Sequence, residues 1–549
     1  LPLCGCSRKT ARVKKHTTPP ELSPALRRYF YFTAAITGAA IMIVEILGAK
    51  MLSPFIGTSH FVWTAQIAVT LIALAVGYYA GGLLVDQSPR PSRLYWAIFF
   101  AAMYLSLTIV VCEPVAYWCL NLKPFALGSL VASMFLFFVP LALLAMVGPF
   151  FVRVLTSVLA NVGGNVGRLT AISTLGSFAG TVLIGYVLVP FLPNSWTMYI
   201  TALVLMLICI IYFGVWGRSR GVVGQVVTAL VMGVSVGALG VYASGIRHRA
   251  GHGKAYEEKF YGNSNFGMLQ VLDIGGVRYY LNDYLTQNTY DPAQKKSMAL
   301  FTYMLHGLAR VYTTKIEDVL CIGLGIGIVP MQFARDGARV DVVEINPAVL
   351  PLAQQFFDFE PSKINLTIGD GRPFLNRCTK QYDAVALDAF LGESSPSHLM
   401  SREAFTEMRR VLKPGGVLTI NAFASFDPGA DFFGASLYRT LTNVFPHVRV
   451  HSAGGGNTFF VASDQPLTKF AREPDLTAVH RAKANEVQMA YAGLIEPEDA
   501  SGSTLLSTLN PNNGRVLTDD FNPVEFFDVK NRERIRRSLA MSMKETQQH

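Results

Sequence analysis

The feature that most constrains this chain is the uneven distribution of its charged residues. Between Tyr29 and Gly217 there are only nine of them, although the chain of 549 residues contains 47 Lys and Arg and 37 Asp and Glu. A stretch of that length with so few charges cannot form the surface of a soluble domain, because such surfaces are rich in charged side chains. A mean hydropathy of +0.34 also excludes a disordered chain. We therefore expect a membrane domain joined to a soluble one.

The weakly charged part divides into apolar runs long enough to cross a bilayer, which takes about 20 helical residues. Seven runs reach this length, near 29–50, 61–85, 94–112, 125–152, 168–192, 195–216 and 222–245. Small residues within 77–82 and 176–180 predict close contacts between helices of an all-α transmembrane bundle. Glu45 is the one acid well inside a run, and function and structural pairing both remain open for it.

Basic residues between the runs predict how this multi-pass protein is oriented in an inner (plasma) membrane. Seven Lys and Arg lie in the first 28 residues, and more arginines fall on the same side if each run spans once: Arg90, Arg93, Arg153, Arg168, Arg218 and Arg220. The positive-inside rule therefore predicts a cytosolic N-terminus. From a cytosolic N-terminus, seven spans would place the rest of the chain on the non-cytosolic side. Arg247, Arg249 and Lys254, which follow the last run, favour the cytosolic side instead. No aromatic residue is interleaved with the basic N-terminal cluster, so we expect no nucleic-acid partner.

From about residue 255 the sequence alternates short strands with amphipathic helices. Strands at 266–274 and 277–281 flank Gly275-Gly276, which predicts a hairpin. Further strands are expected at 318–322, 340–344, 364–368, 384–387 and 417–420. This alternation favours a mostly parallel, doubly wound α/β sheet. The sequence contains no metal-ligand spacing of Cys or His, so no metal site is expected.

A glycine-rich turn followed by an acid indicates a nucleoside site. The strand 318–322 runs into Gly323-x-Gly325-x-Gly327, and the next strand ends in Glu344, 21 residues after Gly323. Glycines at such a turn let the backbone approach a ligand. An acid about 20 residues later accepts hydrogen bonds from ribose hydroxyls.

Two more acids follow at the ends of later strands. Asp370 and Gly371 come directly after one strand, and Asp388 ends the next. Ligands of open α/β sheets bind at the carboxyl ends of the strands, so we expect Asp370, Asp388 and Glu344 to share one crevice. This series favours a cofactor that carries adenosine. Asp383 precedes its strand and is expected in a solvated turn.

These residues resemble the polyamine aminopropyltransferases, the spermidine synthase-like family. The similar stretches are 281–291, 322–327, 343–346, 369–371, 382–388, 412–417 and 517–525. The whole chain resembles the bacterial type in which a multi-spanning segment is fused to such a domain. The resemblance implies a class I methyltransferase-like (Rossmann-like) domain after a small β domain. The expected parts are a basic tail (1–28), a transmembrane helical domain (29–246), a small β-strand domain with a connecting helix (255–310) and the aminopropyltransferase domain (311–549).

The resemblance also implies roles for single residues. Glu344 would bind the ribose hydroxyls, Asp370 the adenine amino group and Gln287 the nucleoside end. Asp388 matches the acid that accepts the proton from the attacking amine. Candidates for holding the distal amine, each with a solvated acid as the alternative, are Glu393, Asp519 and Asp520.

Several positions depart from the family pattern, and all of them concern the half of the site that grips amines. The glycine loop usually carries an acid that holds the donor's amine, and this chain has Ile326 there. A second acid, three residues after the catalytic one, is replaced by Leu391. A Tyr-Gln pair before the loop becomes Phe301-Thr302, and a Gln ahead of the first strand becomes Gly262.

The resemblance implies transfer of an aminopropyl group from decarboxylated S-adenosylmethionine to a polyamine such as putrescine, without a metal, and a possible homodimer through the small β domain. A second possibility is an S-adenosylmethionine-dependent methyltransferase, which Ile326 favours. A third is a membrane transporter or sensor whose soluble half only binds a nucleoside or polyamine. The lipid bilayer is the expected partner of the apolar half. Supply of the donor weakly favours a cytosolic catalytic domain.

Overall fold

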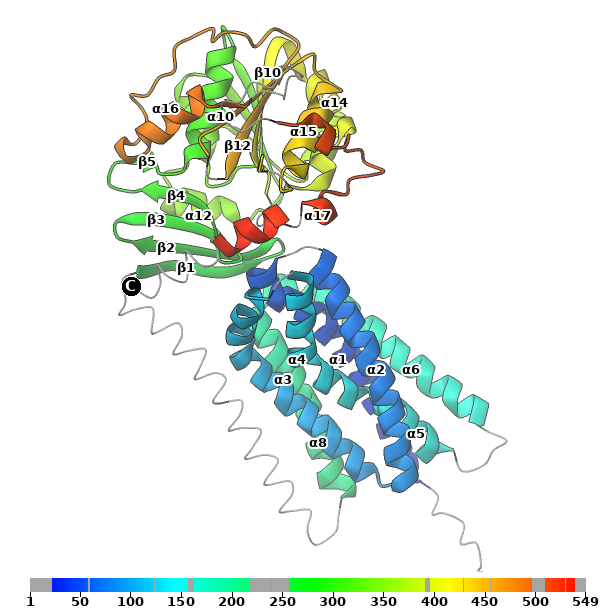
Figure 1. Cartoon of the computed structure of the whole chain (residues 1–549). Helices are drawn as coiled ribbons and strands as arrows, with labels where there is room; N and C mark the ends of the chain where they lie inside the picture. Colours follow the sequence, from blue (N-terminus) through cyan, green and yellow to red (C-terminus); the bar gives the residue numbers. More distant parts are fainter. Residues whose placement is uncertain are drawn as a thin grey trace, which may run out of the picture.

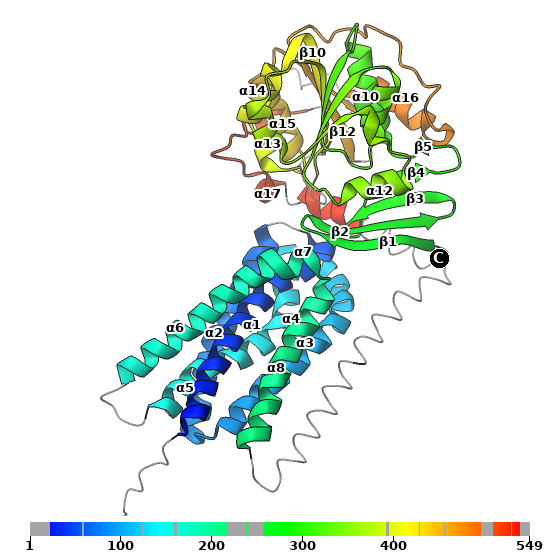
Figure 2. The same ribbon diagram turned by 180° about the vertical axis from the view of Figure 1, so that it is seen from behind.

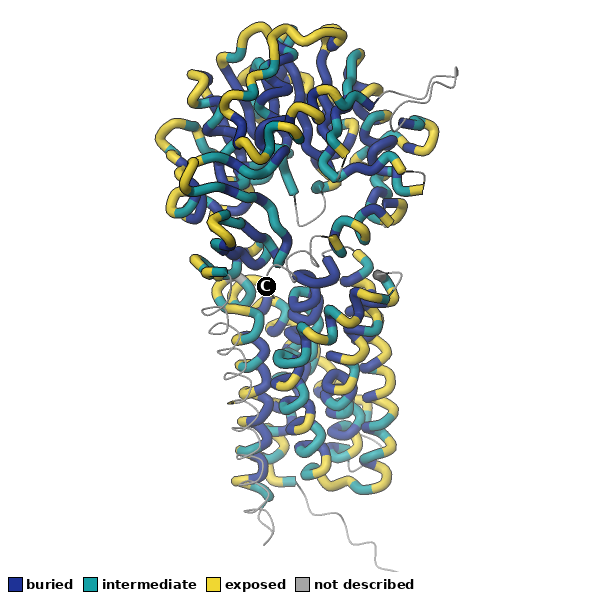
Figure 3. The backbone as a smooth tube through the Cα atoms, turned by 60° about the vertical axis from the view of Figure 1, so that its left-hand side comes forward, coloured by how far each residue is buried: buried dark blue, intermediate teal, exposed yellow. Residues whose placement is uncertain are grey.

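The computed structural model divides the chain into a bundle of long helices and an α/β domain at one end of that bundle (Figures 1 and 2). It describes residues 22–57, 60–122, 125–156, 162–217, 238, 256–390, 395–427, 429–454, 456–495, 509–528 and 530–538. Buried residues gather in the α/β core and where the bundle helices face one another (Figure 3).

The bundle contains the apolar helices that the sequence predicts. Its elements are α1 (Pro24–Ile56), α2 (His60–Gln87), α3 (Pro91–Leu120), α4 (Phe125–Ala145), α5 (Val147–Leu155), α6 (Val162–Leu183), a π-helical turn (Ile184–Leu188), α7 (Val189–Phe191) and α8 (Asn194–Trp216). Within the described residues, six helices are long and apolar enough to cross a membrane, with α4 and α5 together forming one of them. The chain therefore has the make-up of a multi-pass membrane protein. The seventh expected run, 222–245, lies outside the described residues.

Small residues let these helices approach closely, as the sequence predicts. α1 packs along α6, where a Cβ atom on Gly176 would lie 2.1 Å from the carbonyl oxygen of Ala35. α2 packs along α4, where a Cβ atom on Gly77 would lie 2.3 Å from the carbonyl oxygen of Ala142. Gly82 differs, because its Cβ position has nothing within 4 Å. Backbone contact at two glycines thus sets the spacing of two helix pairs.

A small antiparallel sheet follows the bundle in the chain. Its strands, in sheet order, are β1 (Tyr256–Ser264), β2 (Gly267–Ile274), β3 (Val277–Asn282), β4 (Leu285–Asp291) and β5 (Lys296–Ser297). The expected hairpin is confirmed as β2 and β3, whereas β1, β4 and β5 are strands that the sequence pattern did not predict. One face of this sheet packs on α12 (Val349–Phe356) through Leu269, Tyr280 and Leu352.

The α/β domain is built on a mixed sheet with the strand order β13-β11-β12-β10-β9-β6-β7-β8. The strands are β6 (Asp318–Ile322), β7 (Arg339–Glu344), β8 (Asn365–Ile368), β9 (Tyr382–Leu387), β10 (Leu412–Phe423), β11 (His447–Ser452), β12 (Asn457–Ser463) and β13 (Leu494–Ile495). The neighbouring strands β10, β9, β6, β7 and β8 run parallel to one another. At the other edge β12 pairs antiparallel with β10, β11 with β12, and β13 with β11. All residues of β6 are buried, because helices cover both faces of the parallel part.

Helices on the two faces of this sheet enclose two apolar cores. The helices are α10 (Leu300–Tyr312), α11 (Ile328–Arg335), α12 (Val349–Phe356), α13 (Gly371–Arg377), α14 (Arg402–Arg410), α15 (Phe432–Thr442), α16 (Ala484–Ala492) and α17 (Val524–Phe527). One core contains side chains of α10, α11 and α16, and the other contains side chains of α13, α14 and α15. The carboxyl ends of the parallel strands stay uncovered by these helices, which leaves room for a site there.

The α/β domain is attached to the bundle through the small sheet and the helical segment 530–538. Lys50 of α1 donates to the carbonyl oxygen of Asn265 at 3.4 Å, and Phe55 of α1 packs on Tyr284 with ring centroids 5.5 Å apart. The buried guanidinium of Arg536 donates to the carbonyl oxygens of Phe55 and Ser53 at 2.9 and 2.6 Å. The carbonyl groups at the C-terminal end of a helix lack full intrahelical pairing, so Arg536 gives Phe55 a partner and adds a second donor to Ser53, which also accepts from the backbone amide of Gly57 at 3.0 Å.

Candidate active site

The glycine-rich turn begins where β6 ends and leads into α11. Gly323 adopts a φ of +101°, and a Cβ atom there would lie 2.2 Å from the carbonyl oxygen of Asp388. The backbone amide of Asp388 donates to the carbonyl oxygen of Ile322 at 2.9 Å. The turn and the end of β9 are therefore in contact at a separation that only glycine permits.

Glu344 lies at the end of β7, beside this turn. One of its carboxylate oxygens accepts a hydrogen bond from the backbone amide of Leu324 at 2.8 Å, and the other accepts from that of Asn346 at 2.7 Å. Burial raises the pKa of Glu344, although these backbone donors oppose the effect. Each oxygen keeps acceptor capacity, so the carboxylate can also bind two hydroxyl groups.

Asp370 lies just after β8, where its side chain caps α13. Its carboxylate accepts from the backbone amide of Arg372 at 2.8 Å and lies 3.2 Å from Nε2 of His398. A Cβ atom on Gly371 would lie 2.7 Å from the side chain of Ile322, so glycine lets α13 start close to β6. The cap orients the carboxylate at the same sheet edge as Glu344.

Asp388 follows β9 and has a different environment from the other two acids. Asn421, at the end of β10, donates from its side chain to Oδ1 of Asp388 at 3.0 Å. Asn457 in turn donates to the side-chain oxygen of Asn421 at 2.9 Å. Desolvation deep in the fold raises the pKa of Asp388 to about 6, the charge of Glu344 adds to the rise, and the bond from Asn421 opposes it.

These residues line one cavity of about 330 Å³ between the small sheet and the carboxyl ends of the parallel strands. Seven of the residues singled out from the sequence contribute to its wall: Gln287, Gly323, Gly325, Glu344, Asp370, Gly371 and Asp388. Gln287 enters from β4 of the small sheet, so the cavity is closed by both parts of the catalytic half. Gly327 is the N-cap residue of α11 and does not line this cavity.

The candidates for the distal amine are not brought to this cavity. Asp519 pairs with Arg372 at 2.8 Å and accepts a hydrogen bond from Ser401, and neither it nor Asp520 lines the cavity. Glu393 lies outside the described residues. A further acid that lines the cavity, besides the three strand-end acids, is Glu486 of α16, paired with Lys483 at 2.7 Å.

One expectation about the acids is wrong. Asp383 lies within β9, and its carboxylate accepts from the backbone amides of Glu317 and Asp318, both at 2.8 Å, and from Lys413 at 3.0 Å. It therefore ties the beginnings of β6 and β9 together, at the opposite edge from the cavity. These partners are far from Asp383 in the sequence, so a local pattern could not reveal them.

Several cavity residues have no counterpart in the sequence argument. They are His398, Asn421, Asn457, Lys483 and Glu486. The strand-end rule that selects Asp388 would also have selected Asn421, which directly follows the strand expected at 417–420 and lies near the end of β10. Asn457 and Glu486 come from an antiparallel strand and a distant helix, and no sequence signal connects them to the site.

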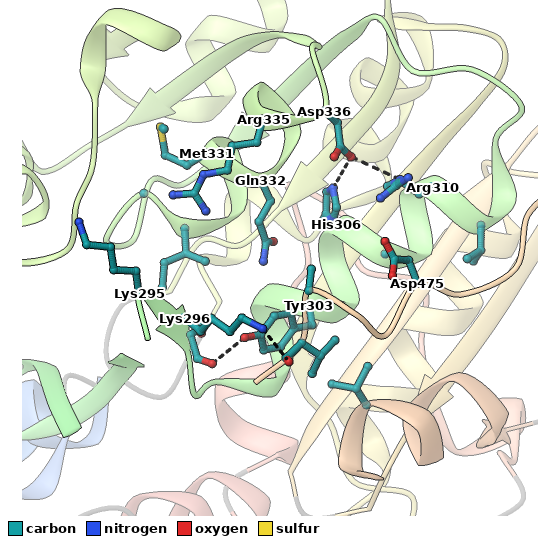
Figure 4. A pocket seen from close by; sticks show the side chains of 18 of the residues that line it. Lys295, Lys296, Tyr303, His306, Arg310, Met331, Gln332, Arg335, Asp336 and Asp475 are labelled. Carbon is teal, nitrogen blue, oxygen red and sulfur yellow. Dashed lines mark hydrogen bonds and ion pairs between the residues drawn. The ribbon is translucent and has the colours of Figure 1, made fainter. Parts of the chain in front are cut away.

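A second cavity of about 220 Å³ lies between α10, α11 and residues 472–479 (Figure 4). Some of its charged side chains pair with one another, and Lys295 lies 3.2 Å from Asp358. Asp336 binds His306 at 2.8 Å and Arg310 at 3.3 Å. The three strand-end acids line the first cavity and not this one, so we place the candidate active site in the first.

The chain is similar in sequence to several known proteins. The sequence model of the spermine/spermidine synthase domain matches residues 298–428. A polyamine aminopropyltransferase of Vibrio vulnificus is 31% identical over 243 residues, which cover 42% of this chain and 77% of that protein. An N-terminal histidine N-methyltransferase of Emericella nidulans is 32% identical over 151 residues, 26% of each protein. The crystal structure of spermidine synthase from Thermotoga maritima is 18% identical, covers 42% of this chain and 84% of that one, and has a TM-score of 0.35.

Fold and site together define an α/β transferase domain of the class I methyltransferase type, preceded by a small β sheet and by membrane-span helices. The strand-end acids and the glycine turn lie at the carboxyl ends of the parallel strands, where open α/β sheets bind their ligands. More narrowly, the chain belongs to the spermine/spermidine synthase family, which confirms the resemblance and the fold class expected from the sequence.

Proposed function

We propose that this protein is a membrane-bound aminopropyltransferase that moves the aminopropyl group of decarboxylated S-adenosylmethionine to a polyamine such as putrescine. The observation that carries the proposal is the position of Asp388. Its carboxylate lies in the same cavity as Glu344 and Asp370, at the carboxyl end of a parallel strand, with a pKa raised to about 6.

The donor half of the proposed site rests on the other two acids. Glu344 would accept hydrogen bonds from the ribose hydroxyls, and Asp370 from the adenine amino group. Gln287 would contact the nucleoside from the small sheet. Charge-assisted hydrogen bonds of this kind are stronger than neutral ones, so two carboxylates give the adenosine end a defined orientation.

The proposed reaction is an in-line attack by an amine on the carbon bonded to the sulfonium. A C–N bond forms, the C–S bond breaks, and methylthioadenosine leaves with the electron pair of that bond. Free amines with a pKa near ~10 are almost entirely protonated at neutral pH, so the acceptor needs an anionic pocket and a base. Asp388 would supply both, attracting the cation and taking its proton as the new bond forms.

Recognition of the amines must differ from the family pattern. Ile326 is buried in the apolar cluster between the small sheet and α12, so it cannot hold the donor's amine. Phe301 lines the cavity with an apolar ring. We infer that Glu486, whose carboxylate is in the cavity wall, replaces Asp519 and Asp520 as the candidate for the distal amine of the acceptor.

A methyltransferase that uses S-adenosylmethionine is the second candidate function. The apolar Ile326 favours it, and so does the similarity to a histidine N-methyltransferase over 151 residues. In that case Asp388 would deprotonate the nitrogen that receives the methyl group, and the same cavity would hold the nucleoside.

The deciding experiment is mass spectrometry of the products after the purified full-length protein is incubated with each donor and a panel of amines. Aminopropylated amine together with methylthioadenosine supports the first proposal. Methylated amine with S-adenosylhomocysteine establishes the second. Binding of nucleoside or polyamine without product from either donor would overturn both and favour the transporter or sensor.

A further inference from the structure

Three phenylalanines are exposed on the part of the α/β domain that lies nearest the bundle. Phe521, Phe526 and Phe527 are 49%, 60% and 46% exposed, and we call them the phenylalanine cluster. Large apolar side chains gathered in water cost free energy, and such patches mark contacts with other molecules or with membranes. The proposed reaction assigns them no role, because none of them lines the active-site cavity.

Local structure explains why these rings point outward. Val524, the first residue of α17, is 5% exposed and packs into the core of the α/β domain. Phe526 follows two positions later and projects from another face of this short helix, whereas Phe527, three positions later, lies beside Val524 at the edge of the buried face. Phe527 packs on Phe432, with ring centroids 4.8 Å apart, which orders the cluster without burying it.

α17 lies against the first turn of α2, one of the candidate membrane spans (Figures 1 and 2). The carboxylate of Glu525 lies 3.0 Å from Nδ1 of His60 and accepts from the backbone amide of His60 at 3.4 Å. Trp63, one turn further along α2, is 39% exposed. Tryptophan is enriched where a span leaves the hydrocarbon and enters the headgroup layer. α17, with Phe526 and Phe527, therefore lies beside the end of α2 at which a bilayer would place its headgroup layer.

The lipid-facing side of α2 continues toward the cluster. His60, Trp63, Ile67 and Leu71 recur at helical spacing along one face, and Ile67 and Leu71 are 45% and 62% exposed. That stripe ends at the residue that contacts Glu525 of α17. The exposed apolar stripe of α2 thus ends beside α17, which carries two of the three phenylalanines, and the polar pair of His60 and Glu525 lies between them.

A cation completes this surface. The guanidinium of the exposed Arg515 lies 5.3 Å from the ring centroid of Phe527 and 5.9 Å from that of Phe521. Aromatic rings with an arginine at their edge suit the boundary between acyl chains and phosphate groups, because the rings enter the apolar layer while the cation meets phosphate.

We propose that the phenylalanine cluster inserts into the interfacial layer of a phospholipid bilayer and holds the α/β domain on the membrane surface. The contact would act close to the active site. The side chain of Asn522, next to Phe521, donates to the carbonyl oxygen of Ser397 at 3.1 Å, and the flanking Pro396 and His398 line the cavity. The anchor is therefore bonded to the cavity rim.

A photocrosslinking experiment on the full-length protein tests this contact. The protein carries p-benzoylphenylalanine in place of Phe526 and is reconstituted in nanodiscs of phosphatidylcholine and phosphatidylglycerol. The matched control carries the same residue in place of Met489, which is 56% exposed on α16 and lies far from the bundle (Figure 1). After illumination, the digested protein is analysed by mass spectrometry for phospholipid adducts.

We expect phospholipid adducts at position 526 roughly tenfold more often than at position 489, because a site away from the bilayer meets lipid only by chance. The same replacement at Phe521, which is 49% exposed, gives an independent reading if the first variant does not elute as a folded protein. Equal adduct yields at 526 and 489, or none at either phenylalanine, would overturn the proposal. Covalent dimers at 526 in place of lipid adducts would also overturn it and assign the cluster to a second copy of the chain.

Discussion

At the scale of single residues, three acids in one cavity differ through their partners. Glu344 accepts two backbone hydrogen bonds and Asp370 caps a helix, so both are held in place by main-chain groups. Asp388 instead accepts from the side chain of Asn421 and has a pKa of about 6. A carboxylate whose pKa lies near the working pH is suited to take up a proton during a reaction.

Asp388→Asn tests this assignment, because it keeps the size of the side chain and removes the charge and the base. We expect turnover to fall by about 10²–10⁴, the usual range for general acid–base catalysis. Affinity for methylthioadenosine should change little, since Glu344 and Asp370 are the residues proposed to bind the nucleoside. Turnover and calorimetric binding are measured on the same preparation. Near-normal turnover with binding retained would remove Asp388 from the mechanism, and loss of both would indicate a structural role.

The pH profile tests the environment of Asp388. In the proposed reaction the ionised form of Asp388 is the base. kcat/KM should therefore rise as pH increases through about 6 and then reach a plateau, and this rising part is the acidic limb of the pH profile. Asn421→Leu removes the donor that stabilises the ionised form, so the pKa should rise further and the limb should move to higher pH. One hydrogen bond to a charge is worth about 1.5–3 kcal/mol, or roughly one to two pH units.

Asn457→Leu serves as the control for that profile, because Asn457 contacts Asn421 and not Asp388 in the hydrogen-bond chain. A smaller shift is expected for this variant. If the limb of Asn421→Leu coincides with that of the unchanged protein, the hydrogen bond does not set the pKa of the base.

At the scale of elements, the site depends on contacts between strands and turns that are distant in the sequence. The small sheet supplies Gln287 from β4, which pairs antiparallel with β3. β1 and β4 carry polar residues at many positions and alternate poorly, so their pattern predicts no strand. They become strands because β2 and β3 offer them backbone partners.

Gly323→Ala tests the contact between the glycine turn and β9. The added Cβ atom would lie 2.2 Å from the carbonyl oxygen of Asp388, at a φ of +101°. Gly337→Ala is the matched control, since Gly337 has a φ of +87° but nothing within 4 Å of its Cβ position. We expect about 1–3 kcal/mol of strain in both variants and further destabilisation only in Gly323→Ala.

Thermal unfolding and methylthioadenosine binding separate the backbone strain, which both variants share, from the contact of the added Cβ atom with Asp388, which only Gly323→Ala introduces. Gly323→Ala should melt at a lower temperature than Gly337→Ala and lose affinity, whereas Gly337→Ala should keep it. Equal melting temperatures and equal affinities would show that the turn can move away from Asp388 without cost.

At the scale of the whole molecule, the N-terminal end of α1 and the catalytic domain lie at opposite ends of the bundle (Figure 1). Arg27 near the start of α1 contacts Asn165 near the start of α6 at 3.3 Å, and Lys50 near its end contacts Asn265 beside the small sheet. A cytosolic N-terminus and a cytosolic catalytic domain, both expected from the sequence, therefore exclude each other.

The positive-inside rule decides between them, because Arg27, Arg28, Arg90, Arg93 and Arg153 all lie at or near the end remote from the catalytic domain. We expect this domain on the non-cytosolic side. In a bacterial host, alkaline phosphatase fused after His549 should be active, and green fluorescent protein fused after Gly217 should fluoresce. Supply of a cytosolic donor predicts the reverse pattern, so an inactive phosphatase after His549 would refute the charge argument.

Sequence alone determined the properties that depend on neighbours along the chain. Apolar runs predict the membrane helices, and the buried strands β6, β7 and β9 lie within two residues of their expected positions because burial on both faces requires continuous apolar residues. The rule that ligands bind at the carboxyl ends of strands also selected Glu344, Asp370 and Asp388, which line one cavity. Tertiary structure alone decided what depends on distant partners: Asp383 binding to the start of β6, Asp519 pairing with Arg372, and Glu486 entering the cavity. The physical reason is that a charged side chain has the same local pattern in solvent, in an ion pair or in a site, and only its spatial neighbours distinguish these states.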